Sequence, residues 1–253
     1  GQAQSVAYVT RQVQRAVANE NLVYVGRTSS NDGPSVVWAH GKQSRWVEYW
    51  PEADYRDRVV KGQRLWDFPP QYRGQAYSAE GTALVGGKLM GAYVIYPDRK
   101  YNLSRQLPTQ ANACTTTGAL ELGGPAIVGV NWQSYIEQML ACGAASATAH
   151  VRIDGVETTK ITGKPVTVRL SPRYSKVIRE KWVTVQWYLY VNPVTYLPVR
   201  MGGSTKSYGG AGGTTVSSAV TNVQWLQPTK ANIAKTLVTI PPGFTQVKSI
   251  ANV

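Results

Sequence analysis

Long apolar runs, histidines and cysteines are scarce in this chain of 253 residues. No stretch reaches the roughly 18 consecutive apolar residues that a membrane-spanning helix needs, so we predict no transmembrane segment. The histidines are His40 and His150, and neither cysteine lies in a CxxC or CxxH motif. These ligands are too few and too scattered for a zinc cluster, so no metal site is predicted.

Sequence motifs of catalysis are also missing. The chain has no GxSxG, HExxH, P-loop or GxGxxG motif, and GGSTKS lacks the Gly-Lys-Ser/Thr order of a phosphate-binding loop. Glu48 lies in the aromatic segment RWVEYWPEAD, a setting that raises a carboxyl pKa and that also occurs in glycan-binding or glycan-cleaving grooves. Pairing with Arg45 is the simpler interpretation. We therefore predict a non-enzymatic protein without a cofactor.

Acidic residues are few. The chain has 14 of them against 27 Lys and Arg, which gives a net charge of +13. Such a net charge indicates the kind of partner more than the fold. An anionic membrane surface or an acidic cell-wall polymer would be complementary to it. Nucleic acid is disfavoured, because the cations are dispersed, as in VRIDGVETTKITGK, and no zinc-finger or RNP signature occurs.

The sequence contains two cysteines, Cys114 and Cys142. An isolated pair predicts a disulfide and an oxidising compartment. The bond would close a loop of about 29 residues, which is worth roughly 3–4 kcal/mol in the chain-entropy model. Two buried free thiols remain the alternative.

Hydrophobic periodicity predicts two helices among many strands. A stripe of valines from Val6 to Val17 predicts the first helix, with Ser5 as its N-cap and Asn19 as its stop. The second spans 131–142 and ends at a glycine. Period-two runs predict strands near 22–29, 35–39, 44–50, 79–85, 89–96 and 100–106, and further strands between 145 and 226. GGSTKSYGGAGG (202–213) is expected to be a flexible hairpin loop, and a short helical turn should follow Pro228-Thr229.

Alternation along two of these strands predicts one apolar and one polar sheet face. In WVTVQWYLYV the apolar set is Val183, Val185, Trp187, Leu189 and Val191. In the strand at 147–154 it is Ala147, Ala149, Val151 and Ile153, which leaves His150 solvated on the other face.

At least about ten one-sided strands present more apolar surface than two helices cover, and sheets of that width curl. The predicted fold is therefore α+β: a single curled antiparallel β-sheet, or half-barrel, with helices covering its concave face, in one domain over 1–253. A partly covered concave face offers an apolar cavity or groove. Complete filling by side chains and loops is the alternative.

Several stretches resemble the LolA-like lipoprotein-carrier fold family. They are YVIYPDRKYNLSRQ, QMLACG with the upstream Cys114, VRIDGVETTKIT leading to YLYVNPVTYLPVRM, and WLQPTKANIAKTLVTIPPGF. Together they cover most of the chain, although none is diagnostic alone, and Asn192 stands where the family commonly has Asp. The family includes secreted actinobacterial proteins, mycobacterial lipid-binding lipoproteins and RseB-like sensors of anti-sigma-factor systems.

This resemblance implies a cell-envelope protein that holds a lipid or acyl chain in the concave sheet. We expect a lid formed by Trp132, Tyr135, Ile136 and Met139, and a floor formed by Val151, Ile153, Trp187 and Leu189. The chain opens at Gly1 without Met, which suggests a processed or trimmed product, and any signal peptide or anchor would lie upstream. The alternatives are an RseB-like sensor or interaction domain, or a binder of anionic cell-wall polymer through the basic surface.

Overall fold

The fold is given by a computed structural model that describes residues 1–29, 34–49, 59–60, 63–64, 76–107 and 132–248. Strands account for 55% of the structure and helices for 15%, so the protein is mostly β. The chain forms two compact units. Unit 1 contains residues 1–21 and 132–224, and unit 2 contains the described residues of 22–109 and 225–248. The single half-barrel domain over 1–253 stays a prediction.

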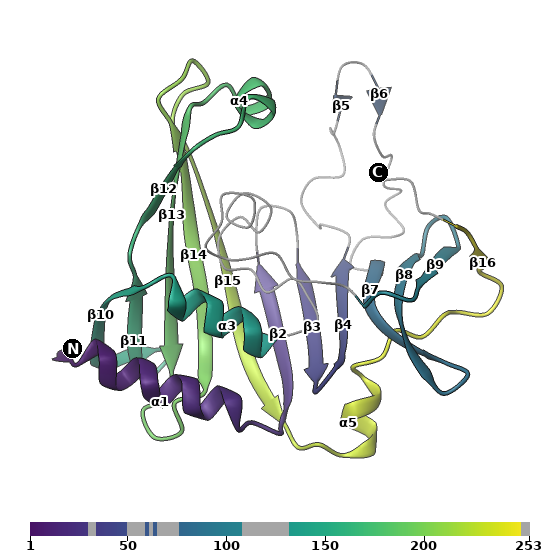
Figure 1. The fold of residues 1–253 in the computed structure, drawn as a ribbon, viewed down its shortest axis with the longest axis horizontal. Coiled ribbons are helices and arrows are strands. Elements are labelled where there is room, and N and C mark those ends of the chain that lie inside the picture. The colour runs from purple at the N-terminus through teal and green to yellow at the C-terminus, as the bar shows by residue number, and fades with distance from the viewer. Residues whose placement is uncertain (30–33, 50–58, 61–62, 65–75, 108–131, 249–253) are drawn as a thin grey trace. The chain divides into compact units, whose positions relative to one another are not determined.

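Unit 1 is an antiparallel sheet with helices (Figure 1). Its strand order is β1-β10-β11-β13-β14-β15, and β12 also pairs with β13. The strands are β1 (Gln2–Gln4), β10 (Ala144–Ile153), β11 (Val156–Gly163), β12 (Val166–Arg169), β13 (Trp182–Val191), β14 (Pro198–Tyr208) and β15 (Thr215–Leu226). The helices are α1 (Val6–Ala18), α3 (Trp132–Ala141) and α4 (Pro172–Ile178).

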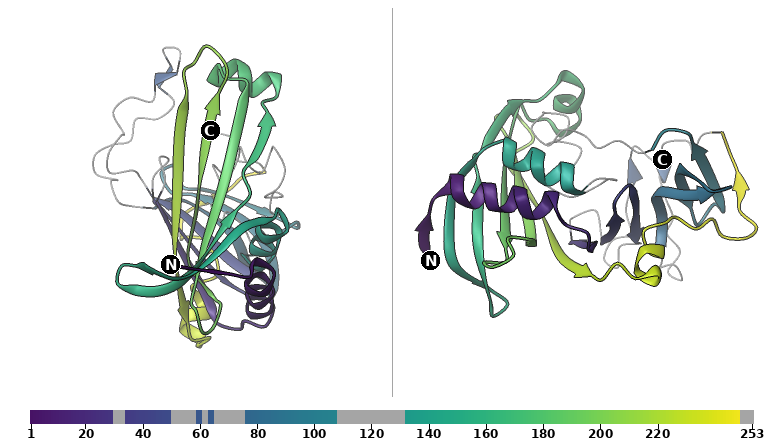
Figure 2. Two further views of the ribbon diagram at one scale, coloured as in Figure 1. Left: turned by 90° about the vertical axis from the view of Figure 1, so that its left-hand side faces the viewer. Right: turned by 60° about the horizontal axis from the view of Figure 1, so that its bottom comes forward.

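Helices α1 and α3 pack against each other, and α1 also contacts β10 of this sheet. The Ser5 side chain caps α1 by accepting a hydrogen bond from the Tyr8 amide, as the sequence predicts. The predicted stripe is confirmed, because Val9, Val13 and Val17 are fully buried. Helix α3 lies beside α1 (Figure 2), where Gln133 Nε2 donates to the Val17 carbonyl at 2.9 Å. This contact satisfies a carbonyl near the C-terminal end of α1.

The two-residue alternation of β13 is confirmed. Val183, Val185, Trp187, Leu189 and Val191 are buried, whereas Trp182 and the four residues between them are at least partly exposed. We call the buried side the inner face of unit 1 and the opposite side its outer face. Cross-strand partners project to the same side of a sheet, so the register of β13 assigns its neighbours to these faces.

In β10 the predicted alternation is wrong beyond Ala149. The register with β11 shifts between Thr148 and Val151, and His150 has a φ of +56°. This is a β-bulge, which adds a residue and reverses the side-chain parity after it. Val151 pairs with Thr158, two positions from Lys160, and therefore lies on the outer face with Ile153. His150 is exposed, as predicted, and its Nδ1 lies 2.8 Å from Glu157 Oε1.

Unit 2 has the strand order β2-β3-β4-β7-β8-β9-β16, and among the described residues these strands belong to the same sheet as those of unit 1. Its members are β2 (Val23–Ser29), β3 (Ser35–His40), β4 (Gln43–Tyr49), β7 (Ala76–Val85), β8 (Lys88–Ile95), β9 (Lys100–Ser104) and β16 (Thr245–Gln246), and β16 runs parallel to β9. Strands β5 (Val59–Val60) and β6 (Gln63–Arg64) pair with each other. The strands predicted between 22 and 106 are confirmed within a few residues.

The C-terminal segment packs on one face of unit 2. Val238 is buried against Val47 and Val94, and Ile240 and Phe244 pack on the same cluster. The predicted helical turn is α5 (Lys230–Ala234), whose N-cap Thr229 accepts from the Asn232 amide. These residues tie the end of the chain to β4, β7 and β8.

Two further expectations need correction. The predicted loop at 202–213 is wrong for residues 202–208, which belong to β14. Helix α4 was not predicted, although Pro172 follows Ser171 as an N1 proline follows an N-cap. Its seven residues are too few for a clear helical period.

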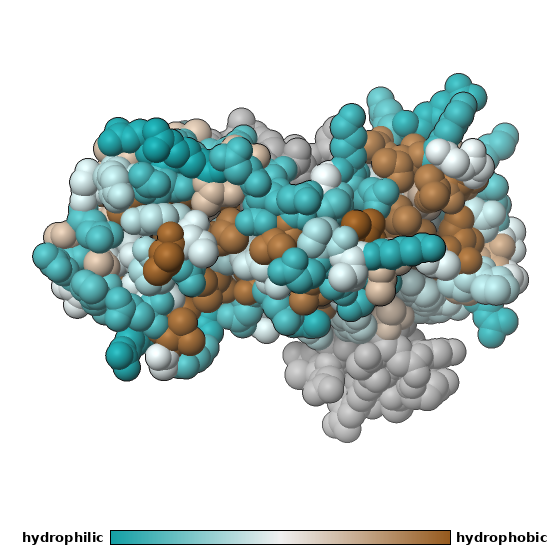
Figure 3. Space-filling model, turned by 90° about the horizontal axis from the view of Figure 1, so that it is seen from below, coloured by the Kyte–Doolittle hydropathy of each residue, from teal (hydrophilic) through white to brown (hydrophobic). Residues whose placement is uncertain are grey.

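Among the described helices, none has the length and hydrophobicity needed to cross a membrane. The exposed large hydrophobic side chains of the described residues include Tyr8 in α1 and Ile178 in α4, and the others lie at turns and strand ends. In unit 2, Leu84 and Val85 are exposed at the β7–β8 turn. Figure 3 shows hydrophobic residues, in brown, gathered toward the right-hand side of the face that it presents.

Candidate ligand-binding face

The inner face of unit 1 is a continuous buried apolar surface. One row of cross-strand partners runs through Ala147, Ile161, Leu189, Met201 and Thr221. All five are buried, and the middle three have no exposed surface. A row of this kind excludes water across five strands, and four of its five members are hydrophobic.

Two polar atoms interrupt this apolar surface. Within the part of the chain that the structure describes, Trp187 Nε1 and Thr205 Oγ1 are buried and have no hydrogen-bond partner. Both belong to the inner face, because Trp187 is opposite Gly203 and Thr205 is opposite Val185. A buried polar group without a partner costs about 1–3 kcal/mol, so a polar group of a ligand could relieve this cost.

The position of Trp187 is fixed by Gly163. A Cβ placed at Gly163 would lie 2.2 Å from the indole Nε1 and Cε2 atoms, far inside van der Waals contact. The absence of a side chain on β11 therefore allows the indole to lie flat on that strand. Thr205 was missed by sequence reasoning because it falls in the predicted glycine-rich loop, although the alternation Met201, Gly203, Thr205 was a usable signal.

The predicted site residues have different outcomes. Trp187 and Leu189 lie on the inner face and are buried, and Ile136 and Met139 are buried in α3. Trp132 and Tyr135 belong to α3, but their side chains lie outside the described residues. The bulge in β10 places Val151 and Ile153 on the outer face, where both are half-buried, so their assignment to the same floor as Trp187 is corrected.

Cys142 is disulfide-bonded. Its predicted partner, Cys114, lies outside the described residues, so the pairing stays a prediction. The backbone beyond Cys142 is held by two hydrogen bonds: the Gly143 amide donates to the Leu140 carbonyl, and the Lys164 amide donates to the Gly143 carbonyl. The bond is thus placed where α3 passes into β10.

The outer face of unit 1 is aromatic and cationic. Lys160 Nζ lies 5.6 Å from the ring centre of Tyr188 and 5.4 Å from that of Tyr190. These two rings meet edge to face. Burial, followed by the neighbouring Tyr190, raises the pKa of Tyr188. Arg200 donates to Asn222 and Asp154. The aromatic rings on this face are therefore partly covered by side chains of the protein.

In unit 2 the carboxylate of Glu48 lies near Ser78 and Tyr93. Glu48 accepts a hydrogen bond from Ser78 Oγ at 3.4 Å, and its charge is among the causes that raise the pKa of Tyr93, after burial. The suggested pairing of Glu48 with Arg45 is wrong. Arg45 Nε donates to the Lys235 carbonyl, and its guanidinium stacks over Trp38 at 4.3 Å. Residues 45 and 48 are three positions apart along β4, an odd number, so their side chains point to opposite faces of the sheet.

Glu80 permits a test of pH dependence. Burial raises the pKa of this carboxyl above its ordinary value, so the folded chain binds more protons than the unfolded chain between the two pKa values. Stability should therefore fall as the pH rises through that window. Glu80→Gln is expected to remove this fall, as measured by urea unfolding at several pH values, whereas the exposed Glu157→Gln should leave it in place. An unchanged pH profile in Glu80→Gln would contradict the assignment.

Over the described ranges, no group of three or more His, Cys, Asp and Glu side chains is arranged to hold a metal ion. The inner face of unit 1 thus combines a broad buried apolar surface with two buried polar atoms that have no partner among the described residues. Comparison with known proteins adds no assignment, because no protein-family model and no curated protein matches the chain.

Proposed function

We propose that this protein is a non-enzymatic, extracytoplasmic cell-envelope protein that binds an amphiphilic ligand, a lipid or another acyl chain. The ligand occupies the inner face of unit 1, beneath α1 and α3. The LolA-like resemblance and its half-barrel geometry belong to this proposal, as does the location outside the cytoplasm, for which the disulfide at Cys142 is the support.

The observation that carries the proposal is the pair of buried atoms, Trp187 Nε1 and Thr205 Oγ1, without partners among the described residues. Stable cores satisfy their buried polar groups, and an exception calls for an explanation. On a surface lined by Leu189 and Met201, these atoms fit the polar group of a bound acyl ligand. The acyl chain itself would gain about 0.8 kcal/mol for each methylene that leaves water.

The helical cover fits entry of a ligand. Helix α3 presents the buried Ile136, Met139 and Leu140, and the unbranched Met139 repacks at low cost. Among the described side chains, one hydrogen bond joins α3 to α1, from Gln133 to the Val17 carbonyl. A ligand that separates α3 from the sheet would therefore replace mainly non-directional contacts.

Thr205→Val tests the proposal, because it exchanges the unpaired hydroxyl for a methyl group of similar size. We expect the affinity for a fluorescent acyl probe to fall about tenfold while the unfolding free energy rises by about 1 kcal/mol. Trp187→Phe should also weaken binding. Ser218→Val, on the exposed side of the same sheet, is the matched control and should leave probe affinity unchanged.

The wild-type protein supplies the decisive measurement. Native mass spectrometry after gentle purification should show an extractable lipid, and the delipidated protein should bind the acyl probe in a saturable manner. An empty protein that also fails to bind the probe would reject the proposal. Equal loss of binding in Thr205→Val and Ser218→Val would reject the assignment of the site.

A further inference from the structure

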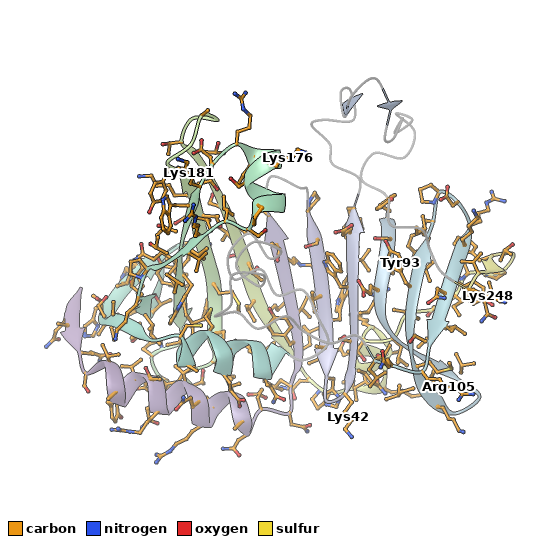
Figure 4. All side chains as sticks on the ribbon, turned by 45° about the horizontal axis from the view of Figure 1, so that its top comes forward. Lys42, Tyr93, Arg105, Lys176, Lys181 and Lys248 are labelled. Carbon is orange, nitrogen blue, oxygen red and sulfur yellow. The ribbon has the colours of Figure 1, made fainter. Side chains whose placement is uncertain are left out.

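One end of unit 1 is strongly basic. This end is formed by the end of β12, by α4, by the start of β13 and by the end of β14. In the segments 166–182 and 204–216, which meet at this end, the sequence contains six Lys and Arg and a single acid, Glu180. The exposed cations, which we call the basic end, are Arg169, Lys176, Arg179, Lys181 and Lys206; Figure 4 shows Lys176 and Lys181 in this region. The positive charge is thus concentrated at one end of the unit.

The single acid offsets only one of these positive charges. Glu180 is 1% exposed, and its Oε2 accepts a hydrogen bond from the Gly210 amide at 2.7 Å. Ser175 Oγ donates to the Glu180 carbonyl, and the Gly212 amide donates to the Arg179 carbonyl. These bonds join the end of α4 to the loop after β14, so the cations are carried by an ordered backbone.

Hydrophobic side chains are exposed among the cations. Ile178 and Trp182 are each 39% exposed, and Val216 is 63% exposed. Arg169, Trp182 and Tyr208 form one cross-strand row, and Lys206 lies directly opposite Val216 in another. The two rows therefore project to the same outer face.

Aromatic rings at this end are held beneath the charges. The Arg169 guanidinium lies 6.0 Å from the Trp182 ring centre, and Lys206 Nζ lies 5.7 Å from that of Tyr208. A Cβ at Gly209 would lie 2.8 Å from Trp182 Cδ1, so the indole packs on a glycine and cannot withdraw in that direction. Trp and Tyr in such settings are typical of a membrane–water interface.

We propose that the basic end docks on an anionic membrane surface. Lys and Arg side chains are attracted to anionic headgroups, while Ile178, Trp182 and Val216 leave water at the acyl boundary. A soluble polyanion, such as a cell-wall polymer or a nucleic acid, would pair with the cations but leave these three side chains in water. This surface is separate from the inner face, and its assignment does not depend on the proposed ligand.

Vesicle flotation tests the docking surface. The wild-type chain should bind vesicles of phosphatidylcholine mixed with phosphatidylglycerol and should not bind phosphatidylcholine alone. The triple variant Lys176→Glu, Lys181→Glu, Lys206→Glu should lose about a hundredfold or more in affinity. The control, Lys42→Glu, Arg105→Glu, Lys248→Glu, makes the same charge change at exposed positions of unit 2 (Figure 4) and should retain binding.

A second variant separates the membrane from a soluble polyanion. Val216→Ser combined with Ile178→Ser keeps every charge, and should weaken vesicle binding several-fold while leaving binding to heparin or single-stranded DNA unchanged. Circular dichroism confirms that each variant is folded. The proposal is overturned if the wild-type chain binds the polyanions but not the vesicles. It is also overturned if phosphatidylglycerol makes no difference, or if the two triple variants lose binding equally.

Discussion

Replacing Gly81 by alanine is expected to destabilise unit 2 by about 3 kcal/mol or more, as a sum of backbone strain and overpacking. Gly81 lies in β7 opposite Arg45 of β4 and has a φ of +152°, a conformation that side-chain-bearing residues rarely adopt. A Cβ there would lie 2.0 Å from the Ser44 carbonyl oxygen. The obstacle is backbone, so rotation of a side chain cannot relieve it.

The strands cannot easily separate at this point either. Thr82 Oγ1 donates to the Ser44 carbonyl at 3.2 Å and accepts from the Ser44 amide at 3.0 Å. Both residues are buried, so moving β4 away from Gly81 would leave polar atoms without partners. The side-chain bonds that hold the two strands together thus require the glycine between them.

Gly86→Ala provides the matched control. Gly86 also has a positive φ, +56°, but a Cβ there would meet nothing within 4 Å. Only the conformational cost remains, which is about 1 kcal/mol. Urea unfolding of both variants measures the difference. Similar losses of stability in the two would show that the contact with Ser44 is not the cause.

The elements that follow from local periodicity were predictable. The valine stripe of α1, its Ser5 cap and the alternation of β13 are all found as expected. Each depends on interactions within a few residues, so the sequence alone contains the information. The same applies to the turn at Asp154-Gly155, where both residues have positive φ.

The features that the sequence did not reveal depend on partners distant along the chain. The bulge at His150 is defined by register with β11, and nothing in ATAHVRID marks an extra residue. The role of Gly163 follows from Trp187 across the sheet. The alternation Met201, Gly203, Thr205 could have placed Thr205 on the inner face, but it could not show that the Thr205 hydroxyl has no partner among the described residues, because that depends on neighbours that only the fold brings together.

Reduction of the disulfide at Cys142 is expected to lower the unfolding free energy by about 3–4 kcal/mol, if its partner is Cys114 and the closed loop has about 29 residues. The chain contains no third cysteine, so a bond within one molecule must join these two. The alternative is a bond between two copies of the chain. Intact mass without reductant separates the two cases, because only the second doubles the mass.

The effect should be local as well as large. Cys142 lies between the end of α3 and Gly143, whose amide donates to the Leu140 carbonyl. Losing the cross-link should therefore increase amide exchange at the end of α3 and the start of β10 before it affects the row through Leu189 and Met201. The variant Cys114→Ser with Cys142→Ser should reproduce the reduced wild type by both stability and hydrogen exchange. Uniform acceleration of exchange along the chain would mean that the bond stabilises the whole fold and does not stabilise α3 in particular. Two alkylatable thiols in the unreduced, denatured protein would mean that there is no bond.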